Sequence, residues 1–491
     1  MTLRDKEPAT AIPMLDEPRS ALPPRAGDAE GLPAGGPWSP AYRLLIVGIL
    51  LTIGGAAFEV LAVATILPAT VEDLGGIGLY GWVFSAFMLA TLIGISVAGG
   101  EADLQGPARP FALGVGLFVV GLLIGGSATS MAMLIAGRAV QGFGSGFISS
   151  VAYVAVGRGL PPAAKPRMLA LMSSAWVVPG LIGPALAGLV ADHIGWRWVF
   201  LGLVPPMLVA TVLALPALRR IPGGSATGRD RRRLARAIQL AAGAGLLLAG
   251  LGGGNLLIAA PLVVAGAVLG WPALQSLMPA GTTRAAPGLP AAVATIGLLN
   301  LAFFGVDAFI PLALTAIRDR SASFAGLALT AATITWTADS WVQARYARRV
   351  SRRVLVRTGL TLVAVGSVGI ALVLAPSVPA LAAPIAWGIA GLGIGIAYST
   401  ISLVILETAP KGEEGVASAG MQLANALGVA LGAGLGGVLI AALSASEDPS
   451  RVSLLTQDLL MVGVLAVAVG IAGRLPARAQ PTEVPDEGTD R

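Results

Sequence analysis

The sequence predicts an all-α membrane protein with two six-helix halves and two extra helices between them, fourteen transmembrane helices in all. Hydrophobic residues make up 55% of the 491 residues and charged residues only 12%, about half of the charged share in ordinary soluble proteins. Mean hydropathy is +0.81. Apolar segments long enough to cross a hydrocarbon layer of ~30 Å follow one another from Tyr42 onward. A pattern of glycines also recurs between the two halves.

The order of apolar and polar stretches predicts the domains. Residues 1–41 mix Pro, Gly and both signs of charge, which predicts a disordered cytoplasmic tail. The apolar segments lie at 42–68, 80–100, 110–128, 131–156, 169–191, 198–217, 236–254, 256–274, 290–316, 323–343, 354–375, 379–406, 416–443 and 455–474. The predicted units are an N-terminal bundle (42–218), a basic cytoplasmic linker (219–235), two inserted helices (236–274), a cytoplasmic loop (275–289), a C-terminal bundle (290–475) and a disordered cytoplasmic tail (476–491).

The glycine pattern predicts an internal repeat, because an offset of 249 residues relates glycines in two separate pairs of segments. The matching positions are Gly142, Gly144 and Gly146 with Gly391, Gly393 and Gly395, and Gly183 and Gly188 with Gly432 and Gly437. The offset keeps both halves in the same orientation. Parallel repeats about an axis along the membrane normal are typical of transporters, and the segments within 236–274 stand outside the repeat.

Basic residues predict the orientation in the membrane, since Lys and Arg in short loops accumulate on the cytoplasmic side. Two clusters dominate, at Arg219, Arg220, Arg229, Arg231, Arg232, Arg233 and Arg236, and at Arg345, Arg348, Arg349, Arg352, Arg353 and Arg357. We interpret them as topology signals near anionic headgroups rather than as a nucleic-acid site. Both termini are then cytoplasmic. Arg far outnumbers Lys, which favours a GC-rich bacterial genome and a bacterial plasma membrane.

Composition argues against an enzyme. There is no Cys, and His193 is the one His, so neither a thiolate nucleophile nor an HExxH zinc site can form. We expect no metal and no cofactor. Lys6, Lys165 and Lys411 fall outside the predicted helices, which disfavours a retinal pump. A non-transporting receptor of the same fold stays open as an alternative.

Ionisable residues inside apolar segments are costly and indicate function by default. Glu59 and Asp307 lie in the first helix of each half, and Arg138 and Asp339 lie in two others. Desolvation favours the neutral form of a carboxylic acid, so Glu59 and Asp307 are candidates for proton coupling. The alternative is a structural carboxylate, paired with Arg138 or bonded to backbone. Arg138 either adjusts the proton affinity of a carboxylate or makes a purely structural ion pair. For Asp339 we favour a structural role at the membrane interface.

Two further groups are candidates for gating and for binding substrate. Gly183, Pro184 and Gly188 combine a missing backbone donor with a small face, which indicates either tight packing or a helix that seals the pathway and pivots. Aromatic residues at mid-helix line a substrate cavity or else face lipid. They are Trp82, Phe87, Trp176, Phe303, Phe304, Trp387 and Tyr398.

Several stretches resemble signature motifs of the major facilitator superfamily, specifically its fourteen-helix drug:proton antiporter group. Phe58 and Glu59 through Pro68 resemble the first-helix motif, with Glu59 where the group usually has Asp. The other matching residues are Arg138, Gln141, Gly142 and Gly144 of the fourth-helix motif, Gly183, Pro184, Ala187 and Gly188 of the antiporter motif, and Trp196, Arg197, Trp198 and Phe200 after it. The loop after the second helix keeps only Asp103, Gly106 and Arg109 of its motif, with Glu101 in place of a leucine. Pro179 stands where an earlier glycine is expected.

The resemblance spans about residues 42–474 and implies proton-coupled efflux of amphipathic or cationic drugs by alternating access. It implies that Arg138 takes part in proton transfer, and that Asp103, Gly106, Arg109, Gln141 and Gly142 serve gating and helix packing. The implied partners are a small hydrophobic or cationic substrate, protons and the lipid bilayer, with the protein as a monomer. Alternatives on the same fold are export of an endogenous lipid, siderophore or metabolite, and proton-coupled import.

Overall fold

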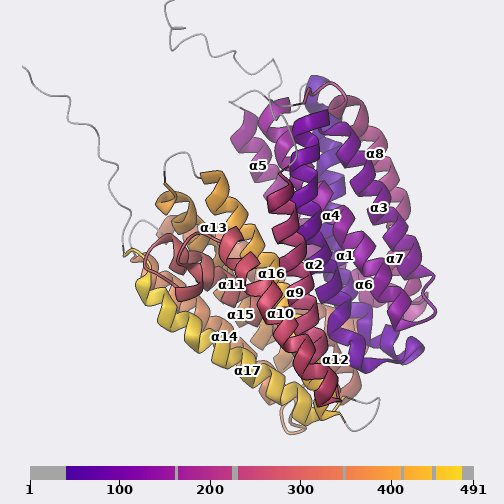
Figure 1. Ribbon diagram of the computed structural model, residues 1–491. Coiled ribbons are helices and arrows are strands. Elements are labelled where there is room, and N and C mark those ends of the chain that lie inside the picture. The colour runs from indigo at the N-terminus through magenta and orange to yellow at the C-terminus, as the bar shows by residue number, and fades with distance from the viewer. Residues whose placement is uncertain are drawn as a thin grey trace, which may run out of the picture.

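The computed structural model describes residues 40–160, 164–223, 230–346, 350–410, 414–444 and 449–477. The predicted tails at 1–41 and 476–491 lie almost wholly outside these residues, as do 224–229 of the linker and the side chains of Arg345, Arg348 and Arg349. The described chain is helical, and Figure 1 shows two groups of helices side by side, the N-terminal half in indigo to magenta and the C-terminal half in orange to yellow.

The first half contains α1 (Pro40–Leu74), α2 (Tyr80–Gln105), α3 (Ala108–Gly126), α4 (Met131–Gly159), α5 (Lys165–Ser174), α6 (Val177–His193), α7 (Arg197–Leu201) and α8 (Val204–Leu218). The inserted pair is α9 (Arg231–Leu251) and α10 (Leu256–Leu277). The second half contains α11 (Leu289–Asp307), α12 (Ile310–Leu312), α13 (Ala322–Tyr346), α14 (Arg352–Val373), α15 (Ala382–Thr408), α16 (Glu414–Leu443) and α17 (Arg451–Ile471). Short turns of helix, η2 (Ile77–Leu79), η4 (Thr282–Arg284), η5 (Ala313–Ile317) and η6 (Ala472–Arg474), lie between or after them.

Within the described residues, twelve helices are long and apolar enough to span a membrane. The predicted count of fourteen is therefore not confirmed. The predicted tenth span is the 25-residue helix α13, which carries Asp339 among its apolar residues and does not reach the apolarity of the twelve.

The predicted single helix at 169–191 is wrong in detail, since the chain breaks at Ala175 and Trp176 into α5 and α6. Pro179 explains the break. Proline has no N–H to donate to the carbonyl of Ala175 four residues earlier, and in the first turn of a new helix, where Pro179 lies, no such bond is needed. The resulting α6 has 17 residues.

The glycine repeat corresponds to matching helix packing in the two halves. A Cβ on Gly142 would lie 2.0 Å from the carbonyl oxygen of Phe87 in α2, and one on Gly391 would lie 2.2 Å from that of Ala332 in α13. Two residues further along each helix, Gly144 packs on α3 and Gly393 packs on α14. Close backbone approach is how small residues join membrane helices. The two six-helix halves of the predicted fold are thus built to one plan.

The halves meet at one end of the bundle, which we call the outer end and define by the turns at 75–79 and 194–196. Asp192 at the end of α6 accepts hydrogen bonds from the backbone N (3.1 Å) and the Oγ (2.5 Å) of Ser323 in α13. On the other side, Ser85 Oγ of α2 donates to the carbonyl of Ala430 in α16 at 2.7 Å. Contacts of α6 with α13 and of α2 with α16 therefore close the outer end.

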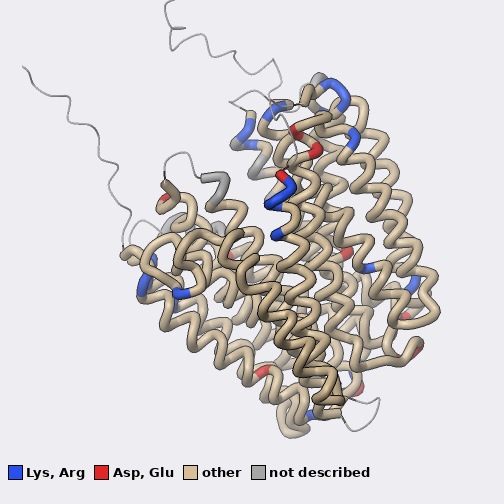
Figure 2. Tube along the Cα trace, in the orientation of Figure 1, with Lys and Arg blue, Asp and Glu red and all other residues tan. Residues whose placement is uncertain are grey.

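Basic residues gather at the opposite, inner end, towards the top and left of Figure 2. The inserted helices cross the front of the molecule in Figure 1. There α9 packs on both α2 and α16 through an apolar cluster that includes Leu240, Leu89 and Leu427. Helix α10 lies outside α9, and its Leu256 and Leu257 are 78% and 84% exposed. The inserted pair therefore covers the α2–α16 side of the boundary between the halves.

Candidate functional site

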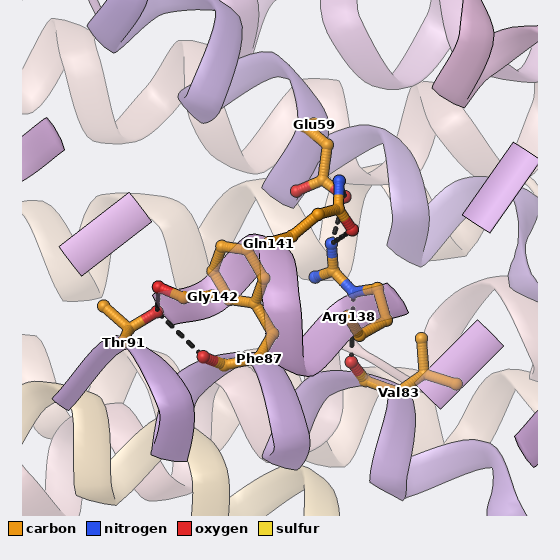
Figure 3. A network of polar contacts seen from close by, with 7 residues as sticks. All are labelled: Glu59, Val83, Phe87, Thr91, Arg138, Gln141 and Gly142. Atoms are coloured by element: carbon orange, nitrogen blue, oxygen red, sulfur yellow. Dashed lines mark hydrogen bonds and ion pairs between the residues drawn. The ribbon is translucent and has the colours of Figure 1, made fainter. Parts of the chain in front are cut away.

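A buried ion pair lies inside the N-terminal half, between α1 and α4 (Figure 3). Glu59 and Arg138 are each 1% exposed, and Arg138 Nη1 donates to Glu59 Oε1. Gln141, fully buried one turn further along α4, donates from Nε2 to the same oxygen at 3.2 Å and accepts from Arg138 Nη1 at 3.0 Å. The ion pair named as the structural alternative for Glu59 is therefore present.

Helix α2 holds the guanidinium from the other side. Arg138 Nε donates to the carbonyl oxygen of Val83 at 3.1 Å, and its Cζ lies 4.1 Å from the centre of the Phe87 ring. The carbonyls of Phe87 and Gly142 both accept a hydrogen bond from Thr91 Oγ1, at 2.8 and 3.0 Å. Figure 3 shows these contacts in one layer. The glycine at position 142 permits the close approach of α2 and α4 that places Val83 within reach of Arg138.

The second carboxylate oxygen of Glu59, Oε2, takes no part in these hydrogen bonds. Oε2 is buried and has no hydrogen-bond partner among the described residues. Burial of a polar atom without a partner is costly, and such atoms in native structures require an explanation. An unpartnered carboxylate oxygen beside a fixed cation is a place where a proton can bind and leave.

Asp307 ends α11 in the C-terminal half and has a different environment. Its Oδ1 accepts the indole N–H of Trp387 at 2.8 Å, and no Arg or Lys of the described residues forms an ion pair with it. Phe303 stacks on Trp387 with 4.7 Å between ring centres and touches Phe304 edge-on at 5.2 Å. The structure thus brings three of the predicted cavity aromatics to Asp307.

Of the other four predicted aromatics, one joins this group and three lie elsewhere. Tyr398 joins the Asp307 group through Trp336, at 5.9 Å between ring centres. Trp82 lies beside Gly245 of the inserted helix α9, and Trp176, 48% exposed, lies at the break before α6. Phe87 is buried under Arg138 rather than in the Asp307 group.

Among the described residues, Asp103 and Arg109 of the loop after the second helix have partners in their own half. Asp103 pairs with Arg158 at the end of α4, whereas Arg109 Nη1 donates to Gln105 at 3.3 Å. Gly106 adopts a φ of +81°, a backbone conformation that favours glycine. The acidic residue of this motif therefore has a basic partner outside the motif.

The small face of α6 lies between the two halves. A Cβ on Gly188 would lie 2.7 Å from backbone atoms of Ala322 and Ser323 in α13, and one on Gly326 of α13 would lie 2.4 Å from the carbonyl oxygen of Pro184. Gly183 faces the ring of Phe58, the residue before Glu59. The face thus contacts both α1 of its own half and α13 of the other.

Three residues of interest were absent from the sequence predictions. Arg158 carries no signal in the sequence, because its role depends on which helices are neighbours, whereas Trp336 lies in the middle of segment 323–343 and meets the rule that selected the other aromatic residues. Asp458 does carry one: it lies inside the apolar segment 455–474 and is 3% exposed, so the rule that selected Glu59 also selects it. Asp339, which was selected, is 9% exposed with Oδ2 unpartnered among the described residues.

Comparisons with known proteins agree with this architecture. The chain is 26% identical over 468 residues to a probable multidrug-efflux transporter of Mycobacterium tuberculosis, covering 90% of this chain and 96% of that protein. It is 25% identical over 401 residues to the multidrug transporter protein MdtP of Bacillus subtilis, covering 79% of this chain and 73% of that protein.

Solved structures show the same fold. A bacterial homologue of the human lysosomal transporter Spinster, in an inward-facing and unoccupied conformation, matches with a TM-score of 0.64 at 14% identity, covering 88% of this chain and 96% of that one. The sequence model of the Major Facilitator Superfamily matches residues 44–433, most of the described helices. With its two repeated halves and this match, the chain is a multi-pass membrane protein that belongs to the Major Facilitator Superfamily of transporters.

Proposed function

We propose that this protein exports amphipathic or cationic drugs from the cytoplasm of a bacterium in exchange for protons, with Glu59 as the proton carrier. The observation that carries the proposal is the buried Glu59–Arg138 pair, in which one carboxylate oxygen stays unpartnered. The relatives named as multidrug-efflux transporters support the substrate class. The basic residues of the inner end support cytoplasmic termini in a bacterial plasma membrane, and we propose a monomer.

Proton binding at Glu59 changes the balance of charge around Arg138. The neutral acid no longer compensates the guanidinium, which stays charged at any ordinary pH. Leaving one partner of a buried pair without its counter-charge costs about 3–5 kcal/mol. We infer that the protonated site favours a conformation in which Arg138 reaches water, and this links the proton to movement of the two halves.

The energy available is sufficient for export. One charge that crosses a membrane potential of 100 mV releases ~2.3 kcal/mol, which corresponds to a concentration ratio of roughly 50 for each charge moved. Exchange that carries net positive charge inward therefore lowers the internal drug concentration by this factor, whereas exchange of one proton for one monovalent cation moves no net charge and is driven by the pH gradient alone.

The test uses purified protein in liposomes that contain a pH-sensitive dye. Addition of lipophilic cations and neutral drugs to wild type is expected to move protons, and Glu59→Gln is expected to abolish this movement. Glu72→Gln is the matched control, because Glu72 lies in the same helix and is exposed; we expect it to behave as wild type. Glu59→Asp, the residue usual in the resembling group, is expected to retain coupling.

Two results would contradict the proposal. Drug movement by wild type without proton movement would point to a uniporter or a lipid exporter. Full coupling in Glu59→Gln, with drug binding intact, would remove Glu59 from the mechanism.

A further inference from the structure

Asp307 is a buried-helix carboxyl group that forms no ion pair with any described basic residue. Glu59, the acidic residue in the corresponding helix of the first half, has Arg138 and Gln141 as partners. Asp307 has one neutral donor, Trp387 Nε1 at 2.8 Å, and forms no ion pair with the described residues. The two carboxylates therefore have different electrostatic environments in two halves of the same design.

The aromatic residues around Asp307 come from three helices. We name them the aromatic cluster: Phe303 and Phe304 of α11, Trp336 of α13, and Trp387 and Tyr398 of α15. Phe303 is its centre, stacked on Trp387 at 4.7 Å and edge-on to Trp336 at 5.9 Å. Aromatic faces attract cations, most strongly where water is excluded. A carboxylate next to such faces provides what an organic cation with apolar substituents requires.

The residues of the aromatic cluster differ in how deeply they are buried. Trp387 and Phe303 are 0% and 3% exposed, whereas Asp307, Phe304 and Tyr398 are only half-buried.

Two contacts locate the cluster at the boundary between the halves. The carbonyl of Ala308, the residue after Asp307, accepts a hydrogen bond from Tyr80 Oη of α2 at 3.1 Å. The ring of Tyr80 also stacks on that of Phe309, two residues after Asp307, with 5.1 Å between ring centres. Substrate sites of repeat transporters lie at the interface of the repeats, so the position fits a ligand rather than lipid.

We propose that Asp307 and the aromatic cluster form the binding site for the positively charged group of a lipophilic cation such as a quaternary ammonium or phosphonium compound. Asp307 neutralises the charge, Trp387 orients the carboxylate through its N–H, and Phe304, Trp336 and Tyr398 contact the apolar substituents. The proposal rests on the proposed export of cationic drugs and separates two roles: Glu59 carries the proton and Asp307 holds the substrate.

The test measures binding of tetraphenylphosphonium to purified full-length protein at equilibrium in detergent, without any gradient. Asp307→Asn keeps the acceptor for Trp387 Nε1 and removes the charge. It is expected to raise the Kd for tetraphenylphosphonium about tenfold and to leave binding of the neutral triphenylphosphine oxide unchanged. Trp336→Leu is expected to weaken cation binding about threefold. Asp458→Asn, a buried carboxylate of the same half, is the matched control and is expected to bind like wild type.

Unchanged tetraphenylphosphonium binding in Asp307→Asn overturns the proposal, and so does an equal loss for the cation and the neutral compound. If binding survives in Asp307→Asn but proton movement in liposomes is lost, Asp307 is a second proton carrier instead. Glu59→Gln separates this test from that of the proposed function, because it is expected to bind the cation while it loses proton movement. An unchanged Trp336→Leu variant removes the aromatic cluster from the site.

Discussion

At the scale of single residues, the proposed proton coupling depends on which groups bond to the guanidinium of Arg138. Arg138 uses Nε for the carbonyl of Val83 and Nη1 for both Glu59 and Gln141. The planar fork of arginine allows these bonds in fixed directions, which a lysine ammonium cannot reproduce. Because the pair is buried, removing either partner is costly: the other charge stays buried without its counter-charge.

This cost gives a prediction for Arg138→Ala. Removal of the cation leaves Glu59 buried without a counter-charge, and we expect a loss of about 3–5 kcal/mol of stability. The double variant Glu59→Gln with Arg138→Ala is expected to be more stable than Arg138→Ala alone, because it removes the orphaned charge. Thermal unfolding in detergent, followed by tryptophan fluorescence, measures both. If the double variant is less stable than Arg138→Ala, with the two losses simply added, the pair does not interact as described.

At the scale of helices, the site depends on glycines that let α2 and α4 touch. Gly142 and Gly146 both lie against backbone atoms of α2, with no room for a Cβ at either position. The contact at Gly142 sets the distance from Val83 and Phe87 to Arg138. Packing of this kind supplies association where lipid gives no hydrophobic drive.

Gly142→Ala is therefore expected to separate α2 from α4. Its Cβ would lie 2.0 Å from the carbonyl oxygen of Phe87, and we expect a loss of about 1–3 kcal/mol, as in other overpacked interiors, together with impaired transport. Gly157→Ala in the same helix is the control, because no atom lies within 4 Å of the added Cβ. It is expected to be neutral or to gain up to about 1 kcal/mol from helix propensity. Equal melting temperatures for the two variants would refute the packing argument.

At the scale of the whole molecule, the halves are joined at the outer end and covered on one side by α9. Asp192 of α6 bonds to Ser323 of α13, and Gly180 of α6 lies against Thr333 of α13. All these contacts cross between the halves. Alternating access of the superfamily type requires that they separate when the outer end opens.

A disulfide across this contact is expected to lock the transporter. A Cβ on Gly180 would lie 3.3 Å from the Cβ of Thr333, close to the separation of about 3.5–4.5 Å found in disulfides. The natural chain contains no Cys, so Gly180→Cys with Thr333→Cys introduces the only thiols. We expect drug transport by the double variant in liposomes to stop on oxidation and to return on reduction. Transport by each single variant is expected to be unaffected by the oxidant. Full transport by the oxidised, cross-linked protein would show that α6 and α13 do not part.

The sequence selected some of the residues that the structure brings together and missed others. Glu59 and Arg138 could be selected because charge inside an apolar segment is visible along the chain, and the structure pairs them across 79 residues. Asp307 was selected by the same rule, but its neighbours were not. Trp336 joins it from another helix, which no local pattern indicates.

The sequence by itself determined that this is a helical membrane protein with two repeated halves and acidic residues in the first helix of each. These properties depend on apolarity and glycine spacing among residues close along the chain. The membrane restricts both, because a segment that spans it must be long, apolar and helical. Only the tertiary structure decided that Asp103 pairs with Arg158, that the fifth helix breaks before Pro179, and that Asp307 lies among aromatic residues and forms no ion pair with the described basic residues. The reason is that such contacts depend on the rotation and packing of helices far apart in the chain, which hydropathy does not encode.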